Sequence, residues 1–360
     1  MRLVFITQTL DAEHPVLAQT LDLVHALAAR SEELVVLCAS VGRHPELPAN
    51  VRVRVFGRTS RLGRGTRFVA ILGSELWRRP RPDAVLTHMV PLFLVLAAPL
   101  AKPLRVRQLL WYTHWHAGRT LRLATRLADL VLSVDRRSFP LASPKVRGIG
   151  HAIDVERFAP AAPLRARDGA LRLLALGRTA RWKGYDTMLA ALERATAAGL
   201  NGRLEIRGPQ LTDDERVHRQ ELEAAIAESG LLRERVVIEP PLPRAELPAV
   251  LAESDALLSA TQPLGSETLD KVVYEAAACG VPVLASNVAL SEFLGGLPVE
   301  LRFPVRDADR LADLLLELAA AGAEARAEVG AELRRRVVAG HSVESWADAV
   351  VAAVADSRPE

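Results

Sequence analysis

The chain has 360 residues and a mass of 39.1 kDa, too long for one ordinary domain and suited to two. Hydrophobic residues make up 49% and charged residues 25%, a composition that excludes a disordered chain. No apolar run approaches the roughly 18 residues of a membrane span, and polar residues follow Ile6 too soon for a signal peptide. We therefore expect a cytosolic protein, soluble or peripheral on the inner face of the membrane.

The net charge of +3 hides an asymmetry between the two halves. Residues 1–150 contain 22 Lys and Arg against 10 Asp and Glu, whereas the remainder contains 24 against 33. A basic half favours a polyanionic partner, either an anionic membrane or a nucleic acid. The arginines lack interleaved aromatic residues and no nucleic-acid-binding module is recognisable, so we expect no nucleic acid.

One segment favours the membrane because it combines cations, an apolar face and an aromatic anchor. Its residues are Arg58, Arg61, Arg64, Arg67, Trp77, Arg78 and Arg79, which flank the apolar run that begins at Phe68. The alternative is a solvated loop followed by an ordinary helix that faces the core and ends in arginine.

Short apolar runs alternate with helical patterns, which indicates a parallel α/β architecture. In the first half the predicted strands are 3–7, 34–39, 51–56, 84–87, 107–112 and 130–133. Between the first two, Leu17, Leu21, Val24 and Ala28 fall on one helical face. Around 148–170, glycine and proline mark a domain boundary.

The alternation then restarts. The predicted strands are 171–176, 204–207, 236–239, 256–259 and 281–285, and the predicted helices are 186–198, 213–228, 244–253 and 270–279. We expect two doubly wound α/β domains, 1–150 and 171–340, joined by a linker at 151–170, with a last helix within 341–360. Ligands of such sheets lie beyond the carboxyl ends of the strands. Cys38 falls in a strand and Cys279 at a helix end, so we expect buried thiols and neither a disulfide nor a zinc site.

The segment from Ser266 to Leu284 places acidic residues around a predicted helix start. Glu267 precedes the helix, residues 269–272 present unpaired backbone amides, and Glu275 lies in the second turn. A helix start of this kind binds anions. The flanking carboxylates would accept hydrogen bonds from hydroxyl groups on either side of the bound anion, as a sugar nucleotide requires. The alternative is a crossover whose two glutamates are merely exposed.

A second cluster runs from Leu176 to Asp186. Arg178 follows a strand and Lys183 precedes a helix, so both cations can converge on a diphosphate and neutralise charge on a leaving group. The segment is no Walker loop, because it lacks the glycines and the Lys-Ser/Thr pair.

These motifs resemble retaining glycosyltransferases of family 4. The resemblance rests on Gly177-Arg178 with Lys183-Gly184, on Glu267 and Glu275 with the Glu-Ala-x-Ala-x-Gly-x-Pro-Val continuation, and on 150–158. Trp111-Tyr-Thr-His114 is similar to a bacterial subgroup that builds surface polysaccharides and glycolipids. The resemblance implies the GT-B fold, two Rossmann-like domains facing across a cleft, with an acceptor domain first and a nucleotide-sugar domain second.

The resemblance also implies roles for individual residues. Arg178 and Lys183 would bind the diphosphate, Glu267 with Thr268, Leu269, Asp270 and Lys271 the sugar and phosphate, and Glu275 the ribose. The base would lie near Pro240 and Leu242, and the last helix would cross back onto the first domain. His114, placed at the end of a strand, would bind the donor sugar and join Glu267, Arg178 and Lys183 as a catalytic residue, unless it is a capped core histidine.

Two departures from the family stand out. The usual glycine-rich loop after the first strand is absent from 7–15, and the usual Gly-Phe-Gly is Thr268-Leu269-Asp270. His88, His116 and His151 have no assigned role. Asp307-Ala-Asp309 resembles a metal-binding Asp-x-Asp but precedes a helix, so we expect it to cap, as we expect a capping box at Thr212-x-x-Glu215. We expect no metal and no cofactor.

The sequence thus predicts a metal-independent glycosyltransferase that moves a hexosyl unit, with retention, from a nucleotide-diphosphate sugar to a hydroxyl of a glycan or lipid-linked acceptor in bacterial polysaccharide or glycoconjugate synthesis. Two alternatives stay open, a nucleotide-sugar epimerase of the same fold and a catalytically idle binding or scaffold subunit. The sugar, the base, the acceptor and the oligomeric state are not predicted.

Overall fold

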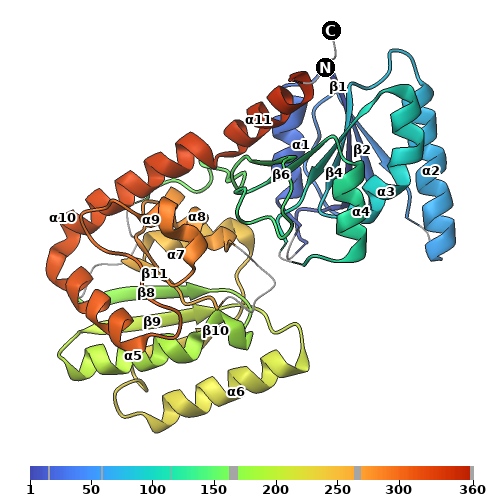
Figure 1. Ribbon diagram of the computed structural model, residues 1–360. Coiled ribbons are helices and arrows are strands. Elements are labelled where there is room, and N and C mark those ends of the chain that lie inside the picture. The colour runs from blue at the N-terminus through green and yellow to red at the C-terminus, as the bar shows by residue number, and fades with distance from the viewer. Residues whose placement is uncertain (15–16, 58–59, 115, 162–168, 263–268, 357–360) are drawn as a thin grey trace. The chain divides into compact units, whose positions relative to one another are not determined.

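The computed structural model describes residues 1–14, 17–57, 60–114, 116–161, 169–262 and 269–356 (Figure 1). The chain divides into two compact units, Met1–Ala152 with Gly340–Glu360 (unit 1) and Ile153–Ala339 (unit 2). Arg58, Glu267 and Thr268 lie outside the described residues.

Unit 1 is built on a parallel sheet in the order β3-β2-β1-β4-β5-β6-β7. Its strands are β1 (Arg2–Leu10), β2 (Glu33–Val41), β3 (Val51–Val55), β4 (Ala84–His88), β5 (Arg107–Trp111), β6 (Leu130–Ser133) and β7 (Val146–Gly148). Four consecutive residues of β1, Leu3 to Ile6, are buried, as in a parallel sheet covered by helices on both faces. The short edge strand β7 was not predicted from the sequence.

Unit 1 also contains helices, most of which connect its strands. They are α1 (Thr20–Ala28), α2 (Arg61–Trp77), α3 (Pro91–Ala101), the 3₁₀ turn η1 (Lys102–Leu104), α4 (Arg119–Leu127) and α11 (Val343–Ala355). The apolar face predicted for α1 is buried at Leu21, Val24 and Ala28. The C-terminal helix α11 lies beside α1 (Figure 1).

Unit 2 repeats the design with a parallel sheet in the order β10-β9-β8-β11-β12. Its strands are β8 (Leu171–Leu176), β9 (Gly202–Arg207), β10 (Val236–Glu239), β11 (Ala256–Ser259) and β12 (Val283–Ala285). Its helices are η2 (Arg181–Lys183), α5 (Tyr185–Ala197), α6 (Asp213–Glu228), η3 (Arg244–Glu246), α7 (Leu247–Ala252), α8 (Lys271–Ala278), η4 (Val288–Leu290), α9 (Ser291–Leu294) and α10 (Ala308–Gly340). Helices α5 and α6 cover one face of the sheet and α7 and α8 the other (Figure 1).

In each sheet, the order in which successive strands are added changes direction once. The reversal falls between β1 and β4 in unit 1 and between β8 and β11 in unit 2. Loops leave the carboxyl ends of two such strands in opposite directions, so ligands of doubly wound sheets lie there. Each unit therefore offers one preferred place for a ligand.

Three local expectations are confirmed. Both cysteines are free and buried, and burial raises the pKa of Cys38 to about 11 and that of Cys279 to about 12. Asp307 caps α10, since its Oδ1 accepts from Arg310 N at 2.8 Å. Thr212 caps α6 by accepting a hydrogen bond from Glu215 N, although the Glu215 carboxylate accepts from Leu211 N rather than from the amide of Thr212.

No described helix is long and apolar enough to cross a membrane.

Candidate functional site

The candidate site of unit 2 lies at the carboxyl ends of β8 and β11. The loop after β8 runs from Gly177 to Gly184, and the loop after β11 leads to Asp270 at the start of α8. Gly184 has a left-handed backbone (φ +70°), and a Cβ there would come within 2.3 Å of Ala260 O. The Lys-Gly pair therefore has a steric cause, because only glycine lets the two loops pack so closely.

Lys183 and Asp270 form a buried ion pair between these loops. Lys183 Nζ donates to Asp270 Oδ1 at 2.5 Å, and the two residues are only 7% and 4% exposed. Asp270 Oδ2 accepts from Thr261 Oγ1 at 2.5 Å and from Ser259 Oγ at 3.3 Å. Since Asp270 uses its carboxylate here, it makes no side-chain hydrogen bond that caps α8.

Arg178 lies in the same loop and is also paired. Its Nε is 3.3 Å from Oε1 of the buried Glu215, at the first turn of α6. Arg178 and Lys183 both lie against the Trp182 indole, with Cζ 5.9 Å and Nζ 4.5 Å from the ring centroid. The structure thus brings together the two cations that the sequence assigns to a diphosphate.

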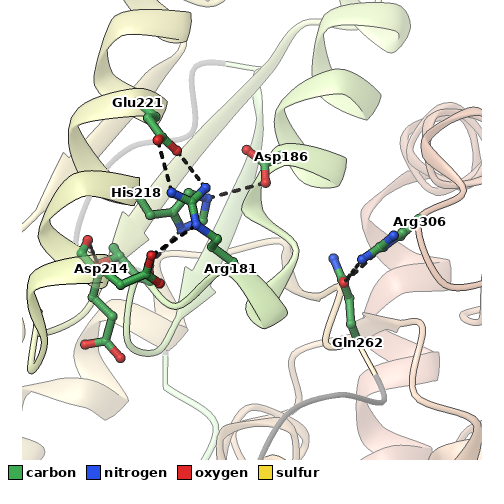
Figure 2. A network of polar contacts seen from close by, with 9 residues as sticks. Arg181, Asp186, Asp214, His218, Glu221, Gln262 and Arg306 are labelled. Carbon is green, nitrogen blue, oxygen red and sulfur yellow. Dashed lines mark hydrogen bonds and ion pairs between the residues drawn. The ribbon is translucent and has the colours of Figure 1, made fainter.

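Helix α6 holds this loop in place. His218 Nδ1 lies 2.8 Å from Thr179 O, and its Nε2 lies 3.4 Å from Asp186 Oδ2. Figure 2 shows the contact of His218 with Asp186 beside the exposed pairs of Arg181 with Glu221 and Asp214. The same view shows Arg306 donating to Gln262 Oε1, at 3.0 Å from Nε and 2.8 Å from Nη2.

Glu275 is a buried carboxylate on α8. Its Oε1 accepts from Arg244 Nη1 at 2.6 Å and lies 3.2 Å from Lys271 Nζ. Burial alone would raise the pKa of this carboxyl, but the charges of Lys271 and Arg244 outweigh it and hold the pKa at about 2. Both cations contact Oε1, and a carboxylate has a second acceptor oxygen, Oε2, to which a ligand hydroxyl could donate.

Sequence reasoning missed Arg244, Glu215 and Thr261. Arg244 follows the Pro240–Leu242 segment, of which Pro240 is exposed and Leu242 half-buried, and its bond to Glu275 connects this segment to α8. Leu269 is buried next to Asp270. An arginine two residues after a proposed base-binding segment was the available signal for Arg244. For Glu215 the only signal in the sequence was a capping box. Thr261 gave no signal beyond being a small polar residue.

In unit 1 the histidines occupy different environments. His114 is exposed and lies three residues beyond the end of β5, so the expectation that it ends a strand is wrong; its ring is 6.0 Å from the Tyr112 ring. The strand ends at Trp111, and the Tyr112 hydroxyl ties the following loop by donating to His116 O. His88 ends β4, is buried, and lies 3.0 Å from Thr7 Oγ1; burial lowers its pKa to about 3, so it is neutral.

Unit 1 also contains a cavity of about 650 Å³ near the carboxyl ends of its central strands. It is lined by Gln8, Thr9, His14, Ala39, Ser40, Arg64, Gly65, Val90, Leu92, Phe93 and Leu96. One wall is apolar and comes from the start of α3, and Arg64 and His14 supply basic groups. Among the described residues of the whole chain, no group of three or more His, Cys, Asp or Glu residues could hold a metal ion.

A comparison with known protein families finds a match in unit 2. Residues 170–321, which include the whole candidate site of unit 2, match the family "Glycosyl transferases group 1". This segment of unit 2 is therefore similar to glycosyl transferases. A GDP-mannose-dependent alpha-(1-6)-phosphatidylinositol monomannoside mannosyltransferase of Mycolicibacterium smegmatis is 30% identical over 223 residues, 54% of this chain and 56% of that protein.

Solved structures match over nearly the whole chain. Sucrose-phosphate synthase from Thermosynechococcus elongatus aligns with a TM-score of 0.73 at 18% identity, covering 99% of this chain and 98% of its own. Anabaena HepE in complex with UDP and glucose aligns with a TM-score of 0.74 at 16% identity, and the alignment covers 99% of this chain and 100% of HepE. A trehalose-6-phosphate synthase, in a study of glycosyltransfer with retention, gives 0.71 at 15%, covering 100% of both. The fold is GT-B, composed of two Rossmann-like domains.

Proposed function

We propose that this protein is a glycosyltransferase that moves a hexosyl group from a nucleotide-diphosphate sugar to an acceptor hydroxyl, with retention of configuration. The observation that carries the proposal is the convergence of Arg178 and Lys183 beside Trp182 at the carboxyl ends of β8 and β11, inside the segment that matches the glycosyl transferases. The UDP bound to HepE and the GDP-mannose named for the mycobacterial relative support a nucleotide donor.

In the proposed reaction the bond between the sugar C1 and the diphosphate oxygen breaks, and a bond from C1 to the acceptor oxygen forms on the same face. The acceptor proton passes to the leaving diphosphate, whose charge Arg178 and Lys183 neutralise. Glu275 Oε2 would accept from the ribose hydroxyls, and we assign Glu267 and His114 to the sugar. The glycosyltransfer with retention studied in the trehalose-6-phosphate synthase supports the same-face course.

We further propose that the acceptor binds in the unit 1 cavity and is amphiphilic. Leu92, Phe93 and Leu96 offer an apolar wall, and Arg64 offers a cation to an anionic group next to it. A cavity with an apolar wall and a few polar groups is typical of small-molecule sites. The lipid acceptor in the name of the mycobacterial relative supports a lipid-linked acceptor over a free glycan.

A donor screen tests the proposal. Incubated with UDP-, GDP- and ADP-hexoses and detergent-solubilised lipid acceptors, the wild-type protein should consume one donor and form a glycosylated product, detected by mass spectrometry. Lys183→Ala and Glu267→Ala should each lower the rate at least about 100-fold, the cost of removing one group that stabilises a leaving charge. Lys102→Ala, an exposed lysine of unit 1, is the matched control and should keep the wild-type rate.

The other outcomes separate the alternatives. Wild-type rates in the Lys183 and Glu267 variants would overturn the site assignment. Isomerisation of the donor without any acceptor would identify an epimerase. No binding of any nucleoside diphosphate in a calorimetric titration would indicate an idle scaffold subunit.

A further inference from the structure

Lys183 contacts an anion supplied by the chain itself. The proposed phosphate ligand donates at 2.5 Å to Asp270, and both side chains are buried. Asp270 therefore occupies a contact of Lys183 that a phosphate would use, with a negative charge of its own.

The carboxylate is the fixed member of the pair. Asp270 Oδ2 accepts from Ser259 at the end of β11 and from Thr261 just after it, so this oxygen is held by short side chains independently of Lys183, which contacts Oδ1. Lys183 reaches it from the loop after β8 on a flexible four-carbon stem with three rotatable donors. When the pair opens, the ammonium moves and the carboxylate stays.

We propose that Asp270 is an internal anion that competes with the donor diphosphate for Lys183, and so sets the affinity for donor and product. The inference rests on the proposed donor site. A diphosphate that bonds Lys183 must share or displace its contact with Asp270, and a second negative charge within a few ångströms opposes the phosphate in a buried site. The same competition helps to release the nucleoside diphosphate product, a step that often limits turnover.

Calorimetric titration of the full chain tests this. The probes are UDP, GDP, ADP and inorganic pyrophosphate, measured at two salt concentrations. Asp270→Asn keeps the shape of the side chain and removes its charge, so it should lower the Kd for the preferred nucleoside diphosphate about tenfold, the factor that 1.4 kcal/mol produces. The affinity should also fall more steeply with added KCl, because one more cation is available to the phosphates.

Control variants keep the result interpretable. Asp309→Asn removes an exposed carboxylate of the same unit, paired with Arg194 at 2.7 Å, and should leave the Kd unchanged. Asp270→Gly removes the whole side chain with its charge and should act like Asp270→Asn if the latter folds poorly. In a Lys183→Met background the increase in nucleotide affinity caused by Asp270→Asn should be lost or much smaller, because Asp270 acts on the affinity through Lys183.

Turnover gives a second readout. In Asp270→Asn the KM for the donor should fall together with kcat, because the product leaves slowly. A Kd that is unchanged or higher in a folded Asp270→Asn protein overturns the inference and leaves the proposed function intact, since Asp270 would then only hold the lysine in place. If neither wild type nor variants bind any probe, the proposed function fails and this inference fails with it.

Discussion

Glu275 shows how a single buried charge is made tolerable. Its carboxylate lies in the interior of unit 2 and contacts two cations, Arg244 from the loop after β10 and Lys271 one helical turn before it. A buried ion needs such partners, because desolvation otherwise costs several kcal/mol. The same argument applies to Lys183 with Asp270, and to Arg178 with Glu215 in a more exposed setting.

Glu275→Gln should destabilise unit 2 by about 3–5 kcal/mol at neutral pH, because Arg244 and Lys271 lose their counter-ion. The folded pKa of about 2 lies below the model-peptide value of 4.5, so the contribution of Glu275 is present above pH 4.5 and is lost as the pH falls toward 2. We expect the difference in melting temperature between wild type and variant, measured by thermal unfolding from pH 7 to pH 3, to become smaller below pH 4.5. Glu324→Gln, at an exposed position of α10 in the same unit, is the control, and an equal difference in melting temperature at all pH values would contradict the assignment.

Helix α6 shows how one element positions another. Thr212 caps it, Glu215 binds Arg178, and His218 binds the carbonyl of Thr179. The first two turns of α6 thus support the loop that carries both proposed phosphate ligands. The Arg181 pairs drawn in Figure 2 are exposed, and pairs of that kind contribute little to stability.

Helix α2 carries the proposed membrane contact. Its first turn exposes Leu62 (79%), and at its carboxyl end Trp77 (68%) and the arginines at 78 and 79 are exposed. Phe68, Leu72 and Leu76 are buried in the core of unit 1 instead, so the alternative of a helix that faces the core accounts for those residues but not for the exposed ones. We propose that these exposed ends bind an anionic membrane surface.

Vesicle co-sedimentation tests that proposal. The protein should bind phosphatidylglycerol vesicles more tightly than phosphatidylcholine vesicles, and salt should weaken the binding because exposed charges are screened. Trp77→Ala should reduce it by removing the aromatic anchor, whereas Leu211→Ala, exposed in unit 2, should not. Equal binding to both lipids, or none, would show that α2 is an ordinary core-facing helix.

At the scale of the whole molecule, the C-terminal segment completes unit 1 rather than the unit that precedes it in the chain. Trp346 on α11 is fully buried and packs edge-on against Trp111 of β5, with ring centroids 5.8 Å apart. Arg30 Nε donates to Asp348 Oδ1, and Gly150 packs so closely on Gly340 that a Cβ would come within 2.1 Å of its carbonyl oxygen. Helix α11 therefore contributes to the stability of unit 1.

Trp346→Ala should destabilise unit 1 by about 3–5 kcal/mol, the cost of removing a buried tryptophan. Hydrogen–deuterium exchange read by mass spectrometry should show faster exchange in peptides of β5, α1 and α11, with peptides of unit 2 unchanged. Trp77→Ala, which removes an exposed tryptophan of the same unit, is the matched control. Uniformly faster exchange throughout the chain would mean that α11 does not belong to unit 1 alone.

Much of the fold could be read from the sequence because its signals are local. The alternation of apolar runs and helical faces predicted eleven of the strands nearly in place, and α6 was predicted at its observed bounds, since Thr212 marks its start. Lys183 and Gly184 likewise precede a helix as predicted, and Glu275 lies on the predicted helix. Each of these features depends on neighbours within a few residues along the chain.

The partners of these residues could not be predicted in the same way. Asp270 lies 87 positions from Lys183, and Arg244 lies 31 from Glu275. Lys183 and Asp270 meet because β8 and β11 are neighbours in the sheet although β9 and β10 intervene in the chain. An aspartate before a helix predicts a cap when only local residues are considered. The order of the strands instead places a buried ammonium beside it, and the free energy of pairing that charge outweighs the cap.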